Sequence, residues 1–214
     1  ISNNQIKPMQ AIMYFDKSIK IKATSEGYRA KGHSFHKLEK YDDAINCYDK
    51  AINLYNEKKL ISPYGSVVKQ IAEIWVEKGS SCQKKENYDD AINCYDKALE
   101  SEPKYDVALM NKGNTLRIMK KYSDAIKCLD DAIKINPKDY YPHHRKTLAN
   151  IEWEKYSDAI KLAENLLEQF PEESEQTTKL LIQICEETGE TSKQKEYEKK
   201  LQEIIDLKNN KTDG

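Results

Sequence analysis

Apolar side chains recur along this chain at helical spacing, and the pattern itself repeats. A unit that reads Tyr-x-Asp-Ala-Ile begins at Tyr41, Tyr88, Tyr122 and Tyr156. The intervals between these tyrosines are 47, 34 and 34 residues, and the eleven residues 41–51 and 88–98 are identical. Because self-similarity at a fixed period is the signature of stacked units, the pattern predicts a solenoid.

Each unit is expected to form two amphipathic helices. The second helix carries small residues seven positions apart, as at Ala44 and Ala51, with the large Tyr48 between them. The first helix has a glycine inside its apolar pattern, as at Gly32 and Gly79. Glycine in a helix interior costs about 1 kcal/mol relative to alanine, so these glycines predict that a neighbouring helix approaches closely.

The ends of the second helices are also marked in the sequence. An aspartate lies near each start, where the positive end of the helix dipole favours a negative charge. These residues are Asp43, Asp90, Asp124 and Asp158. A proline follows three of the second helices and stops them, at Pro103, Pro137 and Pro171.

The combined pattern resembles the tetratricopeptide repeat, which reads W-x2-L-G-x2-Y, then A-x3-F, then Pro over 34 residues. The second copy fills these positions with Trp75, Gly79, Cys82, Ala91, Tyr95, Ala98 and Pro103. The first copy has Tyr28, Gly32, Phe35, Ala44, Tyr48 and Ala51, and the third has Leu109, Gly113, Leu116, Ala125, Leu129, Ala132 and Pro137. A degenerate fourth copy keeps Ala159 and Pro171. The resemblance implies an all-α fold, a right-handed superhelical solenoid of antiparallel helix pairs.

The repeat divides the chain into successive segments. We expect a partial repeat at 1–24 that keeps only its second helix, units at 25–71, 72–105, 106–139 and 140–173, a capping helix pair at 174–207 and a disordered tail at 208–214. The 13 extra residues of the first interval predict longer helices joined by a loop near 61–66. This insertion either extends the stack, which we favour, or protrudes toward a ligand. The chain begins with Ile1, which suggests a fragment or a processed product.

Charge and hydropathy exclude several classes of partner. The 35 basic and 36 acidic side chains are mixed along the chain and leave a net charge of −1, so we expect neither nucleic acid nor an anionic membrane as a partner. The longest apolar run, residues 11–15, is far shorter than the roughly 20 residues of a membrane-spanning helix.

Five cysteines lack any CxxC pair, which argues against a disulfide framework and a zinc site. Cys47, Cys94 and Cys128 each lie three residues after the alanine of their repeat, so we expect small, buried, reduced side chains. Reduced thiols in the core are typical of a cytoplasmic protein.

We find no motif for catalysis. The chain has no glycine-rich phosphate loop, no HExxH and no GxSxG, so we expect a protein that is not an enzyme and has no cofactor. His33 and His36 share a helical face, but no further ligand in that helix completes a metal site. No metal is predicted.

The resemblance implies that function lies on the concave surface lined by the first helix of each unit, which in this family receives a peptide or an extended segment of a partner. The residues expected to line this groove are Arg29, His33, His36, Lys37, Glu77, Val107, Met110, Asn111, Asn114, Arg117, Tyr141, His144 and Arg145. Among them, the basic side chains of Arg29, Lys37, Arg117 and Arg145 would favour acidic segments.

Some family members hold the C-terminal carboxylate of a heat-shock protein in a clamp of Lys, Asn, Asn, Lys and Arg from three consecutive units. On the last three units, Asn111 and Arg145 match the middle Asn and the final Arg, whereas Val76, Ser80 and Tyr141 do not match. Because a buried carboxylate needs several charge-assisted donors together, we do not expect this clamp.

The leading hypothesis is therefore a non-catalytic scaffold that binds a peptide or an extended segment of a partner protein. Two alternatives stay open. One is a peptide-sensing regulatory domain of a larger protein, and the other is self-association through the N-terminal edge, where a half repeat exposes apolar surface.

Overall fold

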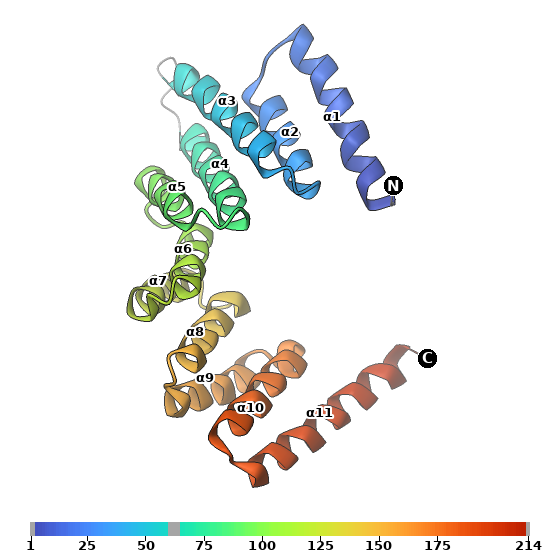
Figure 1. Ribbon diagram of the computed structural model, residues 1–214, viewed down its shortest axis with the longest axis vertical. Helices are drawn as coiled ribbons and strands as arrows, with labels where there is room; N and C mark the ends of the chain where they lie inside the picture. Colours follow the sequence, from blue (N-terminus) through green and yellow to red (C-terminus); the bar gives the residue numbers. More distant parts are fainter. Residues whose placement is uncertain (1–2, 60–64, 213–214) are drawn as a thin grey trace. The chain divides into compact units, whose positions relative to one another are not determined.

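The computed structural model describes residues 3–59 and 65–212, and in these ranges the secondary structure is helical (Figure 1). The chain divides into two compact units, and the boundary between them in the sequence falls between Met119 and Lys120. Within the described ranges, no helix is both long enough and apolar enough to cross a membrane.

The described residues of the first unit, 3–59 and 65–119, form six helices. They are α1 (Asn3–Ile21), α2 (Ser25–Lys37), α3 (Tyr41–Lys59), α4 (Gly65–Lys84), α5 (Tyr88–Ser101) and α6 (Asp106–Ile118). Each helix packs against the next one in the chain, and α4 also packs against both α2 and α6. The first helices of successive repeats therefore lie side by side.

The second unit, as described from residue 120 to residue 212, forms the remaining five helices and one 3₁₀ turn. They are α7 (Tyr122–Ile135), α8 (Tyr140–Glu152), α9 (Tyr156–Gln169), the 3₁₀ turn Pro171–Glu173, α10 (Ser174–Thr188) and α11 (Thr191–Thr212). Consecutive helices again pack against each other. The all-α, helix-pair architecture predicted from the repeat is confirmed within each unit.

Local signals explain where these helices begin and end. The side chain of Thr24 caps α2 by accepting from the backbone N–H of Gly27 at 3.0 Å, and Asp139 caps α8 by accepting from Tyr141 N–H at 3.0 Å. The predicted aspartates all lie in the first turns of α3, α5, α7 and α9. At the end of α10, Gly189 takes the left-handed conformation with φ of 72°.

Close packing explains the glycines inside first helices. A Cβ atom added to Gly32 would lie 2.8 Å from Cε1 of Tyr48, and one added to Gly79 would lie 2.6 Å from Cε1 of Tyr95. Both tyrosines are buried. Each glycine thus leaves room for the large side chain of the second helix, as the sequence predicted.

In the fourth repeat, the first helix carries the larger of the two packing residues and the second helix carries the smaller one. Its glycine position holds Thr147 and its tyrosine position holds Ala163, and both side chains are fully buried. The repeat that departs most from the sequence pattern therefore retains one larger and one smaller residue at the same two positions.

The structure bears on two predictions about the chain's less regular segments. Residues 60–64, where the loop predicted near 61–66 falls, lie outside the described residues, and α4 already begins at Gly65. The disordered tail predicted from residue 208 is wrong for residues 208–212, because α11 continues to Thr212. No proline or glycine interrupts the sequence between Thr191 and Thr212, so nothing in the local sequence stops this helix earlier.

Candidate functional site

The face formed by α2, α4 and α6 carries ten of the thirteen residues predicted to line a groove. Helix α2 provides Arg29, His33, His36 and Lys37, α4 provides Glu77, and α6 provides Val107, Met110, Asn111, Asn114 and Arg117. We call this surface the α2–α4–α6 face. Because α4 packs against both neighbours, these residues come from three adjacent helices of one compact unit.

Two adjoining hollows lie between α2 and α4. The larger, of about 360 Å³, is lined by Glu26, Arg29, Ala30, His33, Tyr55, Gln70 and Glu77. The smaller, of about 190 Å³, is lined by His33, His36, Tyr48, Val76, Glu77 and Ser80. His33 and Glu77 line both hollows, so the two form one continuous depression along the predicted groove.

Arg29 is bound by two carboxylates in this depression. Its Nη2 atom donates to Glu77 at 2.7 Å, and its Nη1 atom donates to Glu73 at 2.7 Å. The hydrogen bond with Glu77 is the main cause that raises the pKa of the Arg29 guanidinium. Two carboxylates compensate this single cation, so the prediction that Arg29 attracts acidic segments needs correction: its charge is already paired.

His36 is held in a defined orientation. Its Nδ1 atom lies 2.8 Å from Oγ of Ser81, and that hydroxyl donates its own hydrogen to the backbone oxygen of Glu77 at 3.1 Å. Ser81 must therefore accept from His36, which assigns the proton to Nδ1 and leaves Nε2 as an acceptor. Burial lowers the pKa of His36 and keeps the ring neutral.

On α6, polar and apolar groups alternate at the same surface. Val107, Met110 and Asn111 are half-buried, whereas Asn114 is 9 % exposed. Oδ1 of Asn114 accepts from Nη2 of Arg117 at 3.0 Å. This contact fixes the Asn114 amide, so its NH₂ group has a defined direction.

The other three predicted residues belong to the second unit. Tyr141, His144 and Arg145 lie on α8, where Tyr141 is 58 % exposed and His144 and Arg145 are half-buried. The ring of His144 lies 5.3 Å from that of Tyr140. Asn111 and Arg145, the two residues that match the carboxylate clamp, thus belong to different compact units.

Sequence reasoning missed part of the lining. Tyr48 and Tyr55 of α3 reach the hollows from the second helix, and Tyr55 donates to Glu26 at 3.0 Å. The two tyrosines are seven residues apart and so share one helical face, a spacing that could have indicated Tyr55. Gln70 belongs to the insertion, which has no counterpart in the other repeats, so the repeat pattern gave no signal for it.

Within residues 3–59 and 65–212, no cluster of three or more His, Cys, Asp or Glu could hold a metal ion. All five cysteines are unbonded; Cys47 and Cys94 are buried as predicted, whereas the prediction is wrong for Cys128, which is only half-buried.

Comparison with protein families identifies the repeat. Two family models, both described as tetratricopeptide repeat, match this chain, one at residues 72–105 and 107–139 and the other at residues 26–58. No curated protein sequence is significantly similar to this chain.

Several solved structures share the fold. MamA residues 41 to the end from Desulfovibrio magneticus RS-1 superimposes with a TM-score of 0.67 at 17% identity, covering 86% of this chain and 96% of that one. YrrB, described as a TPR protein with an unusual peptide-binding site, has a TM-score of 0.58 at 14% identity, covering 77% of this chain and 79% of that one. The first TPR of Spaghetti (RPAP3), bound to the HSP90 peptide SRMEEVD, has a TM-score of 0.52 at 27% identity, covering 56% of this chain and 95% of that one.

Proposed function

The chain belongs to the tetratricopeptide repeat family, and on this premise we propose that it is a protein-interaction scaffold that binds an extended segment of a partner on the α2–α4–α6 face. Proteins of this fold are in general interaction scaffolds without catalytic machinery. The proposal assigns the binding role to the first helices of the first unit.

The observation that carries this proposal is the continuous depression between α2 and α4. Its walls offer acceptors and donors at fixed positions, among them Nε2 of His36, and α6 adds the amides of Asn111 and Asn114. An extended peptide has unpaired backbone N–H and C=O groups at regular intervals, and such side chains can pair with them. The partly exposed Val107 and Met110 suit apolar side chains of the same segment.

The charges of this face do not favour an acidic partner as strongly as the sequence implied. Arg29 is compensated by Glu73 and Glu77. Lys37 is exposed, and Arg117 is engaged by Asn114. We therefore propose recognition chiefly through backbone hydrogen bonds and apolar contacts, with steering by charge as a smaller contribution.

A relative supports peptide binding as the mode of interaction. The Spaghetti TPR domain was solved with a bound HSP90 peptide. The carboxylate clamp itself is not part of the proposal, because only two of the five positions match it in this sequence.

The test compares two double variants in a capture experiment followed by calorimetry. His33→Ala with Asn111→Ala removes polar groups from the α2–α4–α6 face, and Asn46→Ala with Asn93→Ala removes exposed groups from the second helices α3 and α5. Proteins captured by the unaltered chain are identified by mass spectrometry, and their binding segments are then synthesised and titrated.

We expect the face variant to weaken binding of such a segment at least about tenfold, which corresponds to about 1.4 kcal/mol, while the control variant binds normally. Equal affinity of the face variant and the unaltered chain for every captured segment would refute the assignment. Circular dichroism of both variants establishes that each one folds.

A second candidate function is self-association through α1. This helix packs against α2 and exposes Met9, Met13 and Tyr14, which are 48 %, 64 % and 69 % exposed. Exposed apolar side chains of this size are typical of an interface. We expect Met13→Glu with Tyr14→Glu to abolish any concentration-dependent dimer seen by sedimentation velocity, and a chain that stays monomeric at every concentration would exclude this function.

A further inference from the structure

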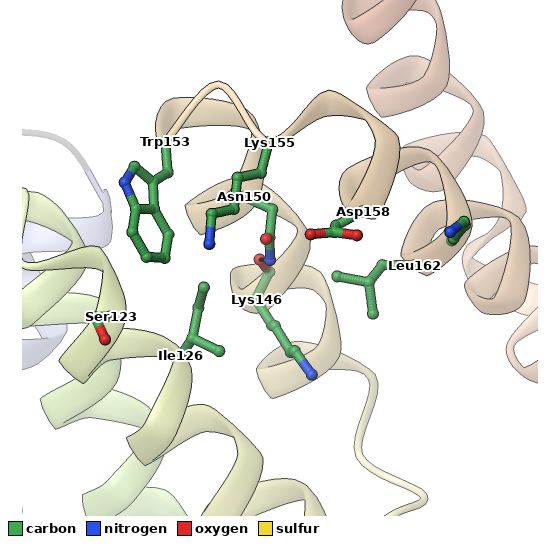
Figure 2. A pocket seen from close by; sticks show the side chains of 9 residues that line it. Ser123, Ile126, Lys146, Asn150, Trp153, Lys155, Asp158 and Leu162 are labelled. Atoms are coloured by element: carbon green, nitrogen blue, oxygen red, sulfur yellow. Dashed lines mark hydrogen bonds between the residues drawn. The ribbon is translucent and has the colours of Figure 1, made fainter.

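A hollow of about 510 Å³ opens in the second unit where α7, α8 and α9 meet (Figure 2). The residues that line it are Ser123, Ile126, Lys146, Asn150, Trp153, Lys155, Asp158, Lys161 and Leu162. None of them belongs to the groove predicted from the sequence. We call this site the Trp153 hollow.

The Trp153 hollow lies on the other side of α8 from the predicted groove residues. Lys146, Asn150 and Trp153 follow one another at helical spacing, and this row is about 130° around the helix axis from Tyr141 and Arg145. A ligand in the hollow would therefore leave the predicted groove residues of α8 uncovered.

Trp153 forms one wall of the hollow and is held from two sides. The ring of Tyr122 stacks on its indole with 6.1 Å between ring centres and an angle of 26°. The Nζ atom of Lys155 lies over the indole, 3.4 Å from the ring centre (Figure 2). Trp153 as a whole residue is still 37 % exposed, so part of its surface faces solvent.

The charges around the hollow are unequal. Three lysines, Lys146, Lys155 and Lys161, face one carboxylate, Asp158. Lys146 is already paired, with its Nζ atom 2.6 Å from Oδ1 of Asp130. Lys155 and Lys161 make no ion pair with any residue in the described ranges 3–59 and 65–212. The rim thus presents two ammonium groups that are in no ion pair, against the single carboxylate of Asp158.

We propose that the Trp153 hollow is a second docking site, which binds an acidic segment of a partner protein. A large apolar side chain of that segment sits between Ile126, Leu162 and Trp153. Neighbouring carboxylates of the segment accept hydrogen bonds from the ammonium groups of Lys155 and Lys161. Such charge-assisted hydrogen bonds are about twice as strong as neutral ones, and the apolar contact adds burial of the exposed indole.

The geometry favours a peptide over a single-stranded nucleic acid, the other ligand that lysines and an aromatic ring can bind. Base stacking needs an open indole face. Here Tyr122 stacks on the indole and the ammonium of Lys155 lies over it.

The test uses the fluorescence of Trp153. The chain has only two tryptophans, Trp75 and Trp153, so the Trp75→Phe variant of the full chain leaves Trp153 as the single reporter. The probe is the synthetic peptide acetyl-Asp-Glu-Phe-Glu-Asp-amide, and the neutral counterpart acetyl-Asn-Gln-Phe-Gln-Asn-amide serves as its control. A short oligothymidylate is titrated in parallel.

Two charge-reversed variants are compared in this background. Lys155→Glu with Lys161→Glu changes the rim of the hollow. Lys195→Glu with Lys199→Glu makes the same change in net charge on exposed positions of α11. Far-UV circular dichroism checks the fold of both.

We expect the acidic peptide to change the emission of Trp153 saturably, and the neutral peptide to bind at least about tenfold more weakly. The rim variant should bind the acidic peptide at least about tenfold more weakly, while the α11 variant binds it with unchanged affinity. Raising NaCl from about 50 to about 500 mM should also weaken binding of the acidic peptide.

Three outcomes would overturn the proposal. One is the absence of any saturable change with the acidic peptide up to about 1 mM. Another is equal weakening by the rim variant and the α11 variant. The last is a response to oligothymidylate alone, which would assign the hollow to nucleic acid. Because every probe reports on Trp153, these outcomes leave the α2–α4–α6 face untouched.

Discussion

The Nζ atom of Lys112 in α6 lies 2.5 Å from Oδ1 of Asp96 in α5, and this contact joins the second helix of one repeat to the first helix of the next. The same two positions are paired at three other junctions: Lys31 with Asp16, Lys78 with Asp49, and Lys146 with Asp130. In every case the lysine side chain is mostly buried, with an exposed fraction between 17 % and 23 %. We call these pairs the junction ion pairs.

The junction ion pairs end where the capping helices begin. The lysine position falls on Leu180 in α10, a buried apolar residue. The aspartate position falls on Glu164 in α9, which accepts a hydrogen bond from the hydroxyl of Tyr197 in α11 at 3.3 Å. The pairs thus mark the junctions between repeats and are absent from the junction with the cap.

A double-mutant cycle on Lys112→Met and Asp96→Asn should measure a coupling free energy of about 1 kcal/mol, the upper end for surface pairs, because the ammonium is largely shielded from water. Urea unfolding of the four proteins checks this value. The matched control is the cycle on Lys134 and Asp131, an i,i+3 pair in which the lysine is 74 % exposed, and it should show no measurable coupling. Equal coupling in the two cycles would contradict the structural role of the junction ion pairs.

The helices could be predicted from the sequence because the same pattern of residue types recurs in successive repeats. The positions of Gly79, Ala91 and Tyr95 recur with the same spacing in neighbouring copies, so the helix pairs and their packing follow from the period. The lysines and aspartates of the junction pairs recur as well. They were not predicted, because charged residues at surface positions are ordinarily solvated and only the packing shows that these are mostly buried.

The candidate sites were less predictable, for a related reason. The pairing of Arg29 with Glu77 joins residues 48 positions apart, across the insertion that breaks the period. The Trp153 hollow depends on Trp153 and Lys155, in the turn between α8 and α9 of the degenerate repeat. A repeat pattern reports what the copies share, whereas these sites are built from residues in which the copies differ.

Replacing Gly79 by alanine should destabilise the first unit by about 1–3 kcal/mol, because the new Cβ atom would lie 2.6 Å from the buried ring of Tyr95. The double variant Gly79→Ala with Tyr95→Leu copies the smaller residue that the third repeat carries at Leu129. We expect it to lose less stability than the sum of its two single changes. Urea unfolding of the three variants gives the comparison.

Gly189→Ala is the control for this clash. Nothing lies within 4 Å of a Cβ atom added to Gly189, but its φ of 72° disfavours any side chain. This variant should also be destabilised, without rescue by any neighbouring substitution. Strictly additive losses in the Gly79 and Tyr95 pair would show that the clash is not the cause.

Four turns between first and second helices carry a non-glycine residue in the left-handed conformation. These residues are Glu39, Glu86, Lys120 and Glu154, with φ between 60° and 63°. A side chain in this conformation costs about 1–2 kcal/mol, part of which glycine recovers. We expect Glu39→Gly to raise the free energy of unfolding by about 0.5 kcal/mol, measured by urea denaturation.

At an ordinary helical position, substitution by glycine is expected to lower the free energy of unfolding. Glu100→Gly, at an exposed site in α5, should lower the free energy of unfolding by about 1 kcal/mol. A loss of stability in both variants would contradict the conformational origin of the effect.

His36 should make stability fall at mildly acidic pH. Burial lowers its pKa below the ordinary value of about 6.5, and the positive charges of His33 and Lys84 lower it further against the opposing influence of Glu77. Below pH 6.5 the unfolded chain then binds a proton that the folded chain does not, so the free energy of unfolding decreases as the pH falls toward the folded pKa. Above pH 6.5 the contribution is fully present.

Urea unfolding between about pH 5 and pH 8 measures this dependence, and His36→Asn provides the comparison because asparagine can still donate to Oγ of Ser81 but does not titrate. The variant should lose the part of the pH dependence that His36 causes, while that of the remaining groups persists. His143→Asn, a matched change in the second unit, should retain the part of the pH dependence that His36 causes. If the His36 variant and the unaltered chain show the same slope below pH 6.5, the ring is not held neutral by its surroundings, and the tautomer that makes Nε2 an acceptor for a partner loses its support.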